Sequence, residues 1–155
     1  MTFERLETIL LPAIKICQKQ AIEFKKMFGE DLLTIGPVHE SRVIELERHI
    51  KQSIPDFYRK FLERYNPHGL EIMMTGIYGL EEIRNVYDNH HSGMNIFKNG
   101  YIPIIGDNSG NILCVRSDQK ENVTLYIADH EQDFTLDAFD SLERFLVELV
   151  DQKLN

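Results

Sequence analysis

The 155-residue sequence has few of the features that mark a secreted, membrane or metal-binding protein, beginning with only two cysteines. Cys17 and Cys114 stand alone, with no CxxC pair and no histidine at a zinc-finger spacing, so we expect neither a disulfide framework nor a zinc site. No apolar run is long enough to cross a bilayer, and the first ten residues carry acids where a secretory signal has basic residues. We therefore expect a cytoplasmic protein without a membrane span.

Recognisable catalytic motifs are also missing, including GxSxG, HExxH, the P-loop and GxGxxG. Two clusters contain groups that could bind a metal or act as a base, Asp88 with His90 and His91, and residues 129–131, but neither has a companion at a known spacing. The turn 107–111 contains several oxygens, yet its glycine is fourth and not sixth as in a calcium loop. We expect a protein that is not an enzyme and has no metal or cofactor.

Basic residues are scarce in the last third of the chain. Residues 101–155 hold eleven acidic and four basic residues, which accounts for −7 of the net charge of −8. Such a surface repels phosphate groups, so we expect neither a nucleic acid nor an anionic membrane as a partner, whereas a basic protein would be attracted. A surface that only keeps the protein soluble is the alternative.

A helical stripe opens the chain. Apolar residues recur every three or four positions from Phe3 to Phe28, which predicts a helix. Pro12 should kink this helix or begin a second one, and Gly29 is a natural C-terminal stop. We expect residues 1–36 to form a helical extension that lies against the main body or mediates dimerisation. Residues 37–155 would form one α+β domain.

Two further helices are predicted before the first strand. An amphipathic pattern covers residues 37–51, and the next helix begins near Ser53, whose spacing from Asp56 fits a capping box. Pro67 and Gly69 should end that helix before an apolar run begins at Leu70. It carries an apolar face that we expect in the core, with a ligand or partner pocket as the alternative; the face consists of Phe57, Tyr58, Phe61, Leu62 and Tyr65.

The rest of the chain predicts a sheet flanked by helices. Residues 72–77 alternate as one strand, residues 79–90 repeat as a helix, and residues 91–100 form a polar segment that ends in an Asn-Gly turn. Three antiparallel strands follow, joined by turns rich in Asp, Asn, Ser and Gly: Tyr101–Gly106, Ile112–Ser117 and Val123–Ile127. Residues 129–140 look irregular and acidic, and Asp140 or Ser141 caps a last helix. The fold class is α+β with a mostly antiparallel sheet and helices packed on it.

The order of several short motifs resembles the SUKH superfamily, which includes bacterial immunity proteins and fungal cell-wall regulators. The resemblance covers residues 37–150 and rests on Val43–Glu47, Ile54–Tyr58, Phe61-Leu62, Tyr65–Gly69, Ile77–Ile83, Tyr101–Asp107 with Gly110-Asn111, and Ser141–Leu149. The sequence departs from the family at Asn66-Pro67-His68-Gly69, where Asn-Gly-Gly is common, and at Gly110-Asn111, where Gly-Asp is usual. The second departure removes a carboxylate that could have served a ligand or partner.

This resemblance implies a binding protein. Bacterial members are similar to antidotes that hold a polymorphic toxin, often a nuclease or deaminase, inactive, and a regulatory scaffold is the alternative. Because a nuclease surface is basic, an acidic antidote can complement it. We therefore expect the partner to be a basic toxin domain bound by acidic residues that lie partly together on one face: Glu81, Glu82, Asp107, Asp129, Glu131 and Asp133.

Overall fold

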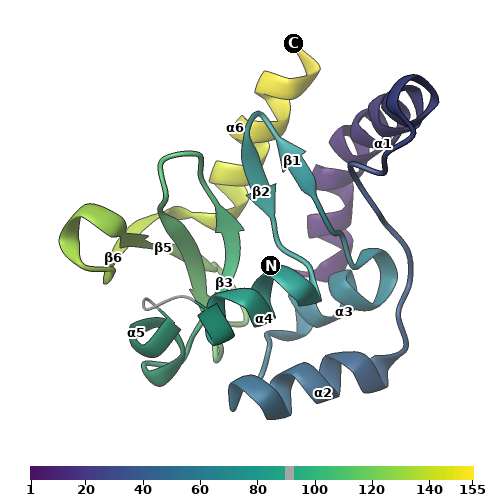
Figure 1. The fold of residues 1–155 in the computed structure, drawn as a ribbon. Helices are drawn as coiled ribbons and strands as arrows, with labels where there is room; N and C mark the ends of the chain where they lie inside the picture. Colours follow the sequence, from purple (N-terminus) through teal and green to yellow (C-terminus); the bar gives the residue numbers. More distant parts are fainter. Residues whose placement is uncertain (90–92) are drawn as a thin grey trace.

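The computed structural model describes residues 1–89 and 93–155 and shows helices packed around an antiparallel sheet (Figure 1). The helices are α1 (Phe3–Phe28), α2 (Glu40–Ile50), α3 (Asp56–Tyr65), α4 (Leu80–Asn89), α5 (Gly93–Lys98) and α6 (Leu142–Leu154). The strands are β1 (Leu70–Ile72), β2 (Thr75–Ile77), β3 (Tyr101–Gly106), β4 (Ile112–Arg116), β5 (Thr124–Asp129) and β6 (Thr135–Ser141), with a 3₁₀ turn η1 (His130–Gln132) between β5 and β6. The predicted α+β class is confirmed.

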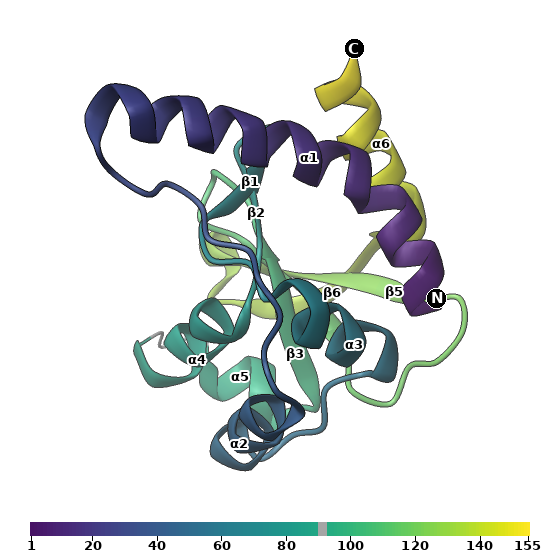
Figure 2. The ribbon, with the colours of Figure 1, turned by 90° about the vertical axis from the view of Figure 1, so that its right-hand side faces the viewer.

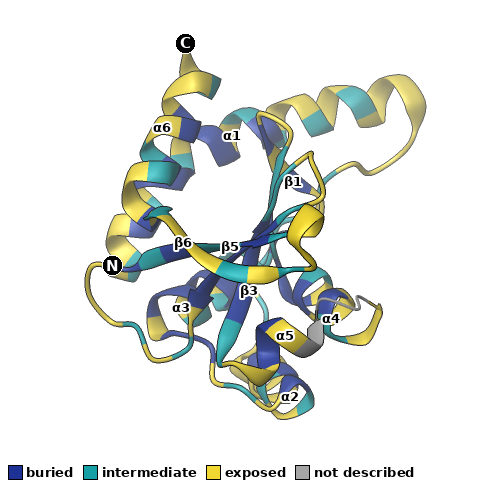
Figure 3. Cartoon of the chain, turned by 90° about the vertical axis from the view of Figure 1, so that its left-hand side faces the viewer, coloured by how far each residue is buried: buried dark blue, intermediate teal, exposed yellow. Residues whose placement is uncertain are grey.

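Each strand pairs antiparallel with the next one, so the order in the sheet is β1-β2-β3-β4-β5-β6. Helices α1 and α6 lie together on one side of the sheet, and α2, α4 and α5 lie on the other (Figures 2 and 3). One buried apolar cluster runs through these layers and includes residues of every helix. None of the described helices is both long and apolar enough to cross a membrane.

Helix α1 is part of this core in its first half. Six of its residues are buried, Leu6, Ile9, Leu10, Ala13, Ile14 and Cys17. Pro12 lies inside the helix and does not begin a second one, although the helix changes direction in this half (Figure 2). Gly29 ends it as predicted, with a left-handed φ of 75°. Beyond Cys17 the apolar side chains Ile22, Met27 and Phe28 are exposed.

The start of α3 differs from the predicted capping box. Its N-cap is Pro55, no side chain caps it, and Ser53 is exposed. Glu47 of α2 holds this corner: its Oε2 accepts a hydrogen bond from the Ile54 N–H at 2.8 Å and lies 2.5 Å from Arg59 Nη2. The capping prediction is wrong because Ser53 does not cap the helix, and the carboxylate at this corner comes from Glu47, which binds the backbone just before α3.

We expect Glu47→Ala to lower the free energy of unfolding by about 1–3 kcal/mol, since it leaves a partly buried guanidinium and a backbone N–H unpaired. Equilibrium denaturation in urea measures the change. Ser53→Ala is the matched control, and it should shift the free energy by less than about 0.5 kcal/mol. Equal losses in the two variants would restore the capping box and contradict the role of Glu47.

Three other segments differ from the sequence predictions. Residues 70–77 form a hairpin and not one strand, because Met73 and Met74 turn the chain with φ of 51° and 63°. Part of the polar segment 91–100 is helix α5, whose Ile96 and Phe97 are buried. The segment 129–140, predicted to be irregular, contains strand β6. His90 and His91 lie outside the described residues.

The predictions for the central hairpin are confirmed. Strand β3 pairs with β4, strand β5 adds beside β4, and no helix interrupts residues 102–127. The Ser141 side chain caps α6 by accepting a hydrogen bond from the Arg144 N–H at 3.3 Å. These elements therefore follow from local signals alone.

Candidate functional site

Four of the predicted acidic residues, Asp107, Asp129, Glu131 and Asp133, occupy two adjacent loops at one end of the sheet, and we call them the acidic tip. Asp107 Oδ1 accepts hydrogen bonds from Ser109 N at 2.9 Å and Asn111 N at 2.8 Å, which closes the β3–β4 turn. Asn111 Oδ1 then accepts a hydrogen bond from the His130 N–H at 3.1 Å. This bond joins the β3–β4 turn to η1, so residues far apart in sequence share one surface.

The four carboxylates of the acidic tip make different contacts. Asp107 closes its turn, and Asp129 Oδ1 accepts a hydrogen bond from the Glu131 N–H at 2.9 Å and so caps η1. Glu131 and Asp133 are exposed, and within residues 1–89 and 93–155 their side chains have no hydrogen-bond or ion-pair partner. These two carboxylates are free to meet a partner without loss of an internal contact.

Glu81 and Glu82 form a separate group at the start of α4. Their carboxylates lie 3.2 and 3.5 Å from Nδ1 of His68, and Glu82 Oε1 also accepts a hydrogen bond from the Gly69 N–H at 3.1 Å. They therefore hold the loop that follows α3. Glu82 is largely committed to the fold, whereas Glu81 is 65% exposed.

Tyr78 lies between these two acidic groups. Its ring covers Gly106, where an added Cβ would meet the hydroxyl oxygen at 2.3 Å. Burial raises the pKa of Tyr78 to about 12, and the carboxylates of Glu82 and Asp107 add to this effect. The hydroxyl stays protonated at neutral pH, so it can donate a hydrogen bond but cannot act as a base.

Strand β6 carries two carboxylates that were not among the predicted partner-binding residues. Asp137 is exposed and Asp140 is half-buried, on a strand that continues directly from the acidic tip. Figure 3 shows β6 at the open edge of the sheet, mostly exposed. The sequence signal for this strand is the alternation of Leu136 and Ala138 with polar residues, which the acidic residues around it obscure.

The candidate cluster at residues 129–131 does not assemble into a metal site among the described residues, and the other candidate cluster includes His90 and His91, which lie outside them. No group of three His, Cys, Asp or Glu side chains gathers in the part of the chain that the structure describes. Asp88 pairs with His49 at 2.6 Å, and His130 Nδ1 lies 3.9 Å from Asp129. Asp88 also pairs with Arg84 at 3.5 Å, and His130 Nδ1 also lies 2.6 Å from Asn111 Oδ1, so these groups are engaged with neighbouring side chains and we assign no reaction to them.

Comparison with known families places most of the chain in a described family. The family model described as "SMI1 / KNR4 family (SUKH-1)" matches residues 37–148. The matched region contains the six strands that the structure describes and the acidic tip, and α1 lies outside it. No curated protein sequence matches the chain.

Proposed function

The chain belongs to the SMI1 / KNR4 family (SUKH-1), and from this membership we propose that it is a cytoplasmic immunity protein that neutralises a basic toxin domain. The family includes immunity proteins and SMI1/KNR4-like regulatory proteins. Toxins that act on nucleic acids carry basic surfaces for phosphate binding, and an acidic protein can cover such a surface by charge complementarity. The toxin would be held inactive because this chain occupies the basic surface that the toxin uses to bind phosphate groups.

The observation that carries this proposal is the acidic tip. Two of its carboxylates are exposed and unpaired among the described residues, and Asp137 continues the negative surface along β6. A dense group of like charges costs the free protein some electrostatic repulsion, which a basic partner would relieve. Glu131 and Asp133 would lie at the rim of the interface and guide the approach of the toxin.

We expect the rate of association to fall as salt rises, because screening shortens the Debye length from about 10 Å at 0.1 M to about 3 Å at 1 M. We expect a gene that flanks the gene for this chain to encode a secreted protein with a nuclease-like or deaminase-like domain, and that domain is the probe. Surface plasmon resonance gives both rates. The double variant Glu131→Lys/Asp133→Lys should slow association about tenfold or more at low salt and change dissociation less.

The control is Glu45→Lys, which reverses an exposed carboxylate on α2, outside the acidic tip. It should leave both rates within about twofold of the original values, since rim charges act locally at physiological salt. Association that is independent of salt, with no effect of the double variant, would leave the acidic tip as a solubilising surface.

A further inference from the structure

The two edges of the sheet differ in how they are protected. Strand β1 has three residues and lies against α1, where Cys17 Sγ is 3.4 Å from the Glu71 carbonyl oxygen. Strand β6 has seven residues, and among the described strands it pairs only with β5. An exposed edge of this length presents unpaired backbone groups that another strand can bind, and proteins commonly cover or shorten such edges.

The hydrogen bonds around β6 indicate which of its amides face outward. Leu142 N donates to the Val123 carbonyl oxygen at 3.0 Å, whereas Ser141 N turns to the Asp140 carboxylate at 2.7 Å. Amide directions alternate along an antiparallel strand, and the bulge between Leu125 and Tyr126 shifts this alternation by one residue at Phe139. The Ala138 N–H therefore faces the open edge.

The charges on β6 select the kind of strand that fits. Residues 133–141 carry three carboxylates, Asp133, Asp137 and Asp140, and no lysine or arginine. A second copy of residues 133–141 would bring six carboxylates together, which opposes self-pairing. An extended segment with lysine or arginine side chains would instead place opposite charges across the new strand pair.

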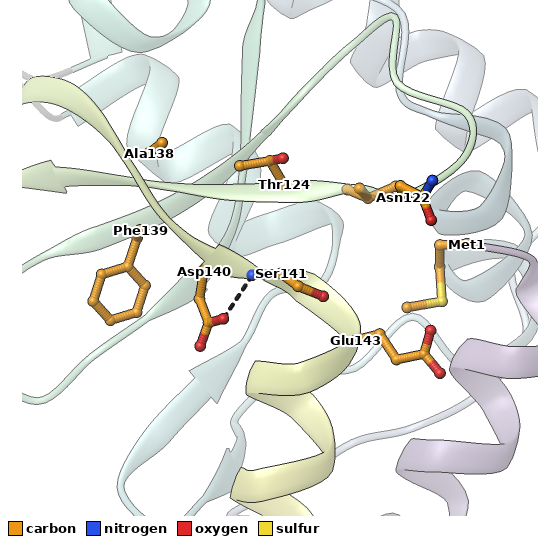
Figure 4. A pocket seen from close by; sticks show the side chains of 9 residues that line it. Met1, Asn122, Thr124, Ala138, Phe139, Asp140, Ser141 and Glu143 are labelled. Carbon is orange, nitrogen blue, oxygen red and sulfur yellow. Dashed lines mark hydrogen bonds between the residues drawn. The ribbon is translucent and has the colours of Figure 1, made fainter.

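Two hollows beside β6 provide places for partner side chains. One has a volume of about 470 Å³ and is lined by Thr124, Ala138 and Ser141 together with the carboxylates of Asp140 and Glu143 (Figure 4). The other has a volume of about 500 Å³ and is lined by Asn95, Asn99, Tyr101, Phe134, Thr135 and Leu136. Phe139, 51% exposed, stands beside the first hollow and packs edge-on against Phe145.

We infer that β6 is a docking strand: a basic, extended segment of the partner adds to its open edge and extends the sheet by one strand. Backbone hydrogen bonds hold the segment, and a lysine or arginine side chain enters the hollow beside Asp140; Glu143 in the same hollow is already ion-paired with Arg5. The identity of the partner rests on the proposed function, since the toxin domain is the source of the basic segment. The docking mode is a separate claim with its own test.

The test uses the expected toxin domain, identified from the genes that flank the gene for this chain, as the probe and a proline at the outward-facing amide. Ala138→Pro should weaken binding about tenfold or more, because proline removes the donor and obstructs a neighbouring strand. Ala138→Thr keeps the N–H and should stay within about twofold of the original affinity. Circular dichroism and thermal melting establish that both variants are folded.

Hydrogen exchange gives a second readout that needs no substitution. The amides of residues 135–141 in the full chain should exchange more slowly in the complex than in the free protein, by about tenfold or more, if a strand is added. Tight binding with unchanged exchange in β6, and with no effect of Ala138→Pro, would overturn the docking strand and leave the proposed function intact. No binding of the toxin domain by the original chain would overturn both, and dimerisation through β6 in sedimentation experiments would replace the basic segment with a second copy.

Discussion

Phe61→Ala is expected to lower the free energy of unfolding by about 3–5 kcal/mol, the range for removing a fully enclosed phenylalanine ring. The Phe61 side chain is completely buried in α3, and its ring centroid lies 5.3 Å from that of Tyr58 and 5.5 Å from that of Tyr65. Tyr58 donates a hydrogen bond to the Tyr78 carbonyl oxygen, and Tyr65 donates one to Glu7 of α1. The ring therefore packs between two tyrosines that tie α3 to the β2–α4 junction and to α1.

Chemical denaturation measures this loss, with Phe28→Ala as the matched control. Phe28 is 61% exposed at the end of α1 and contacts Phe24, so its truncation should change the free energy by less than about 1 kcal/mol. Losses of similar size at the two positions would mean that Phe61 is not enclosed. In that case the aromatic face of α3 would become a candidate binding surface.

Gly79→Ala is expected to destabilise the protein by about 3 kcal/mol or more, because the new methyl group has no space. A Cβ at this position would lie 1.8 Å from the carbonyl oxygen of Pro67. The same loop supplies Asn66, whose Oδ1 accepts a hydrogen bond from the Leu80 N–H at 2.9 Å at the start of α4. Moving the loop to admit the methyl group would break this contact.

Gly36→Ala provides the control for this substitution. An added Cβ at Gly36 meets nothing within 4 Å and its φ is not left-handed, so alanine should be neutral or slightly stabilising. Thermal melting of both variants compares the two positions directly. If the Gly79→Ala protein has the same melting temperature as the original protein, the loop carrying Asn66 and Pro67 is not packed against α4.

The elements that the sequence predicted correctly have local causes. Turn residues separate β3, β4 and β5, and Ser141 caps the helix that follows it. The elements that it missed depend on distant partners or contradict local preference. Glu47 of the preceding helix binds the Ile54 N–H where the sequence predicted a Ser53 cap, and Met73 and Met74 adopt a left-handed turn that glycine or asparagine would normally mark.

The acidic tip was also predicted in part, because its composition is a local property and its assembly depends on contacts between distant residues. The sequence identified an acidic last third, but it could not show that the Asn111–His130 bond joins the turn of Asp107 to η1. The sequence prediction also grouped Glu81 and Glu82 with this set, whereas in the structure both carboxylates pair with His68. Only the structure shows that the carboxylates of Glu131 and Asp133 are free, because they have no partners in the described part of the chain.

The central claim is neutralisation of a toxin, and bacterial growth tests it most directly. The expected toxin domain, identified from the genes that flank the gene for this chain, is expressed from an inducible promoter, alone or together with this protein. We predict that the domain alone stops growth, that the original chain restores it, and that Glu131→Lys/Asp133→Lys at equal abundance restores it less well. Continued growth arrest in the presence of the folded, abundant original chain would contradict the account.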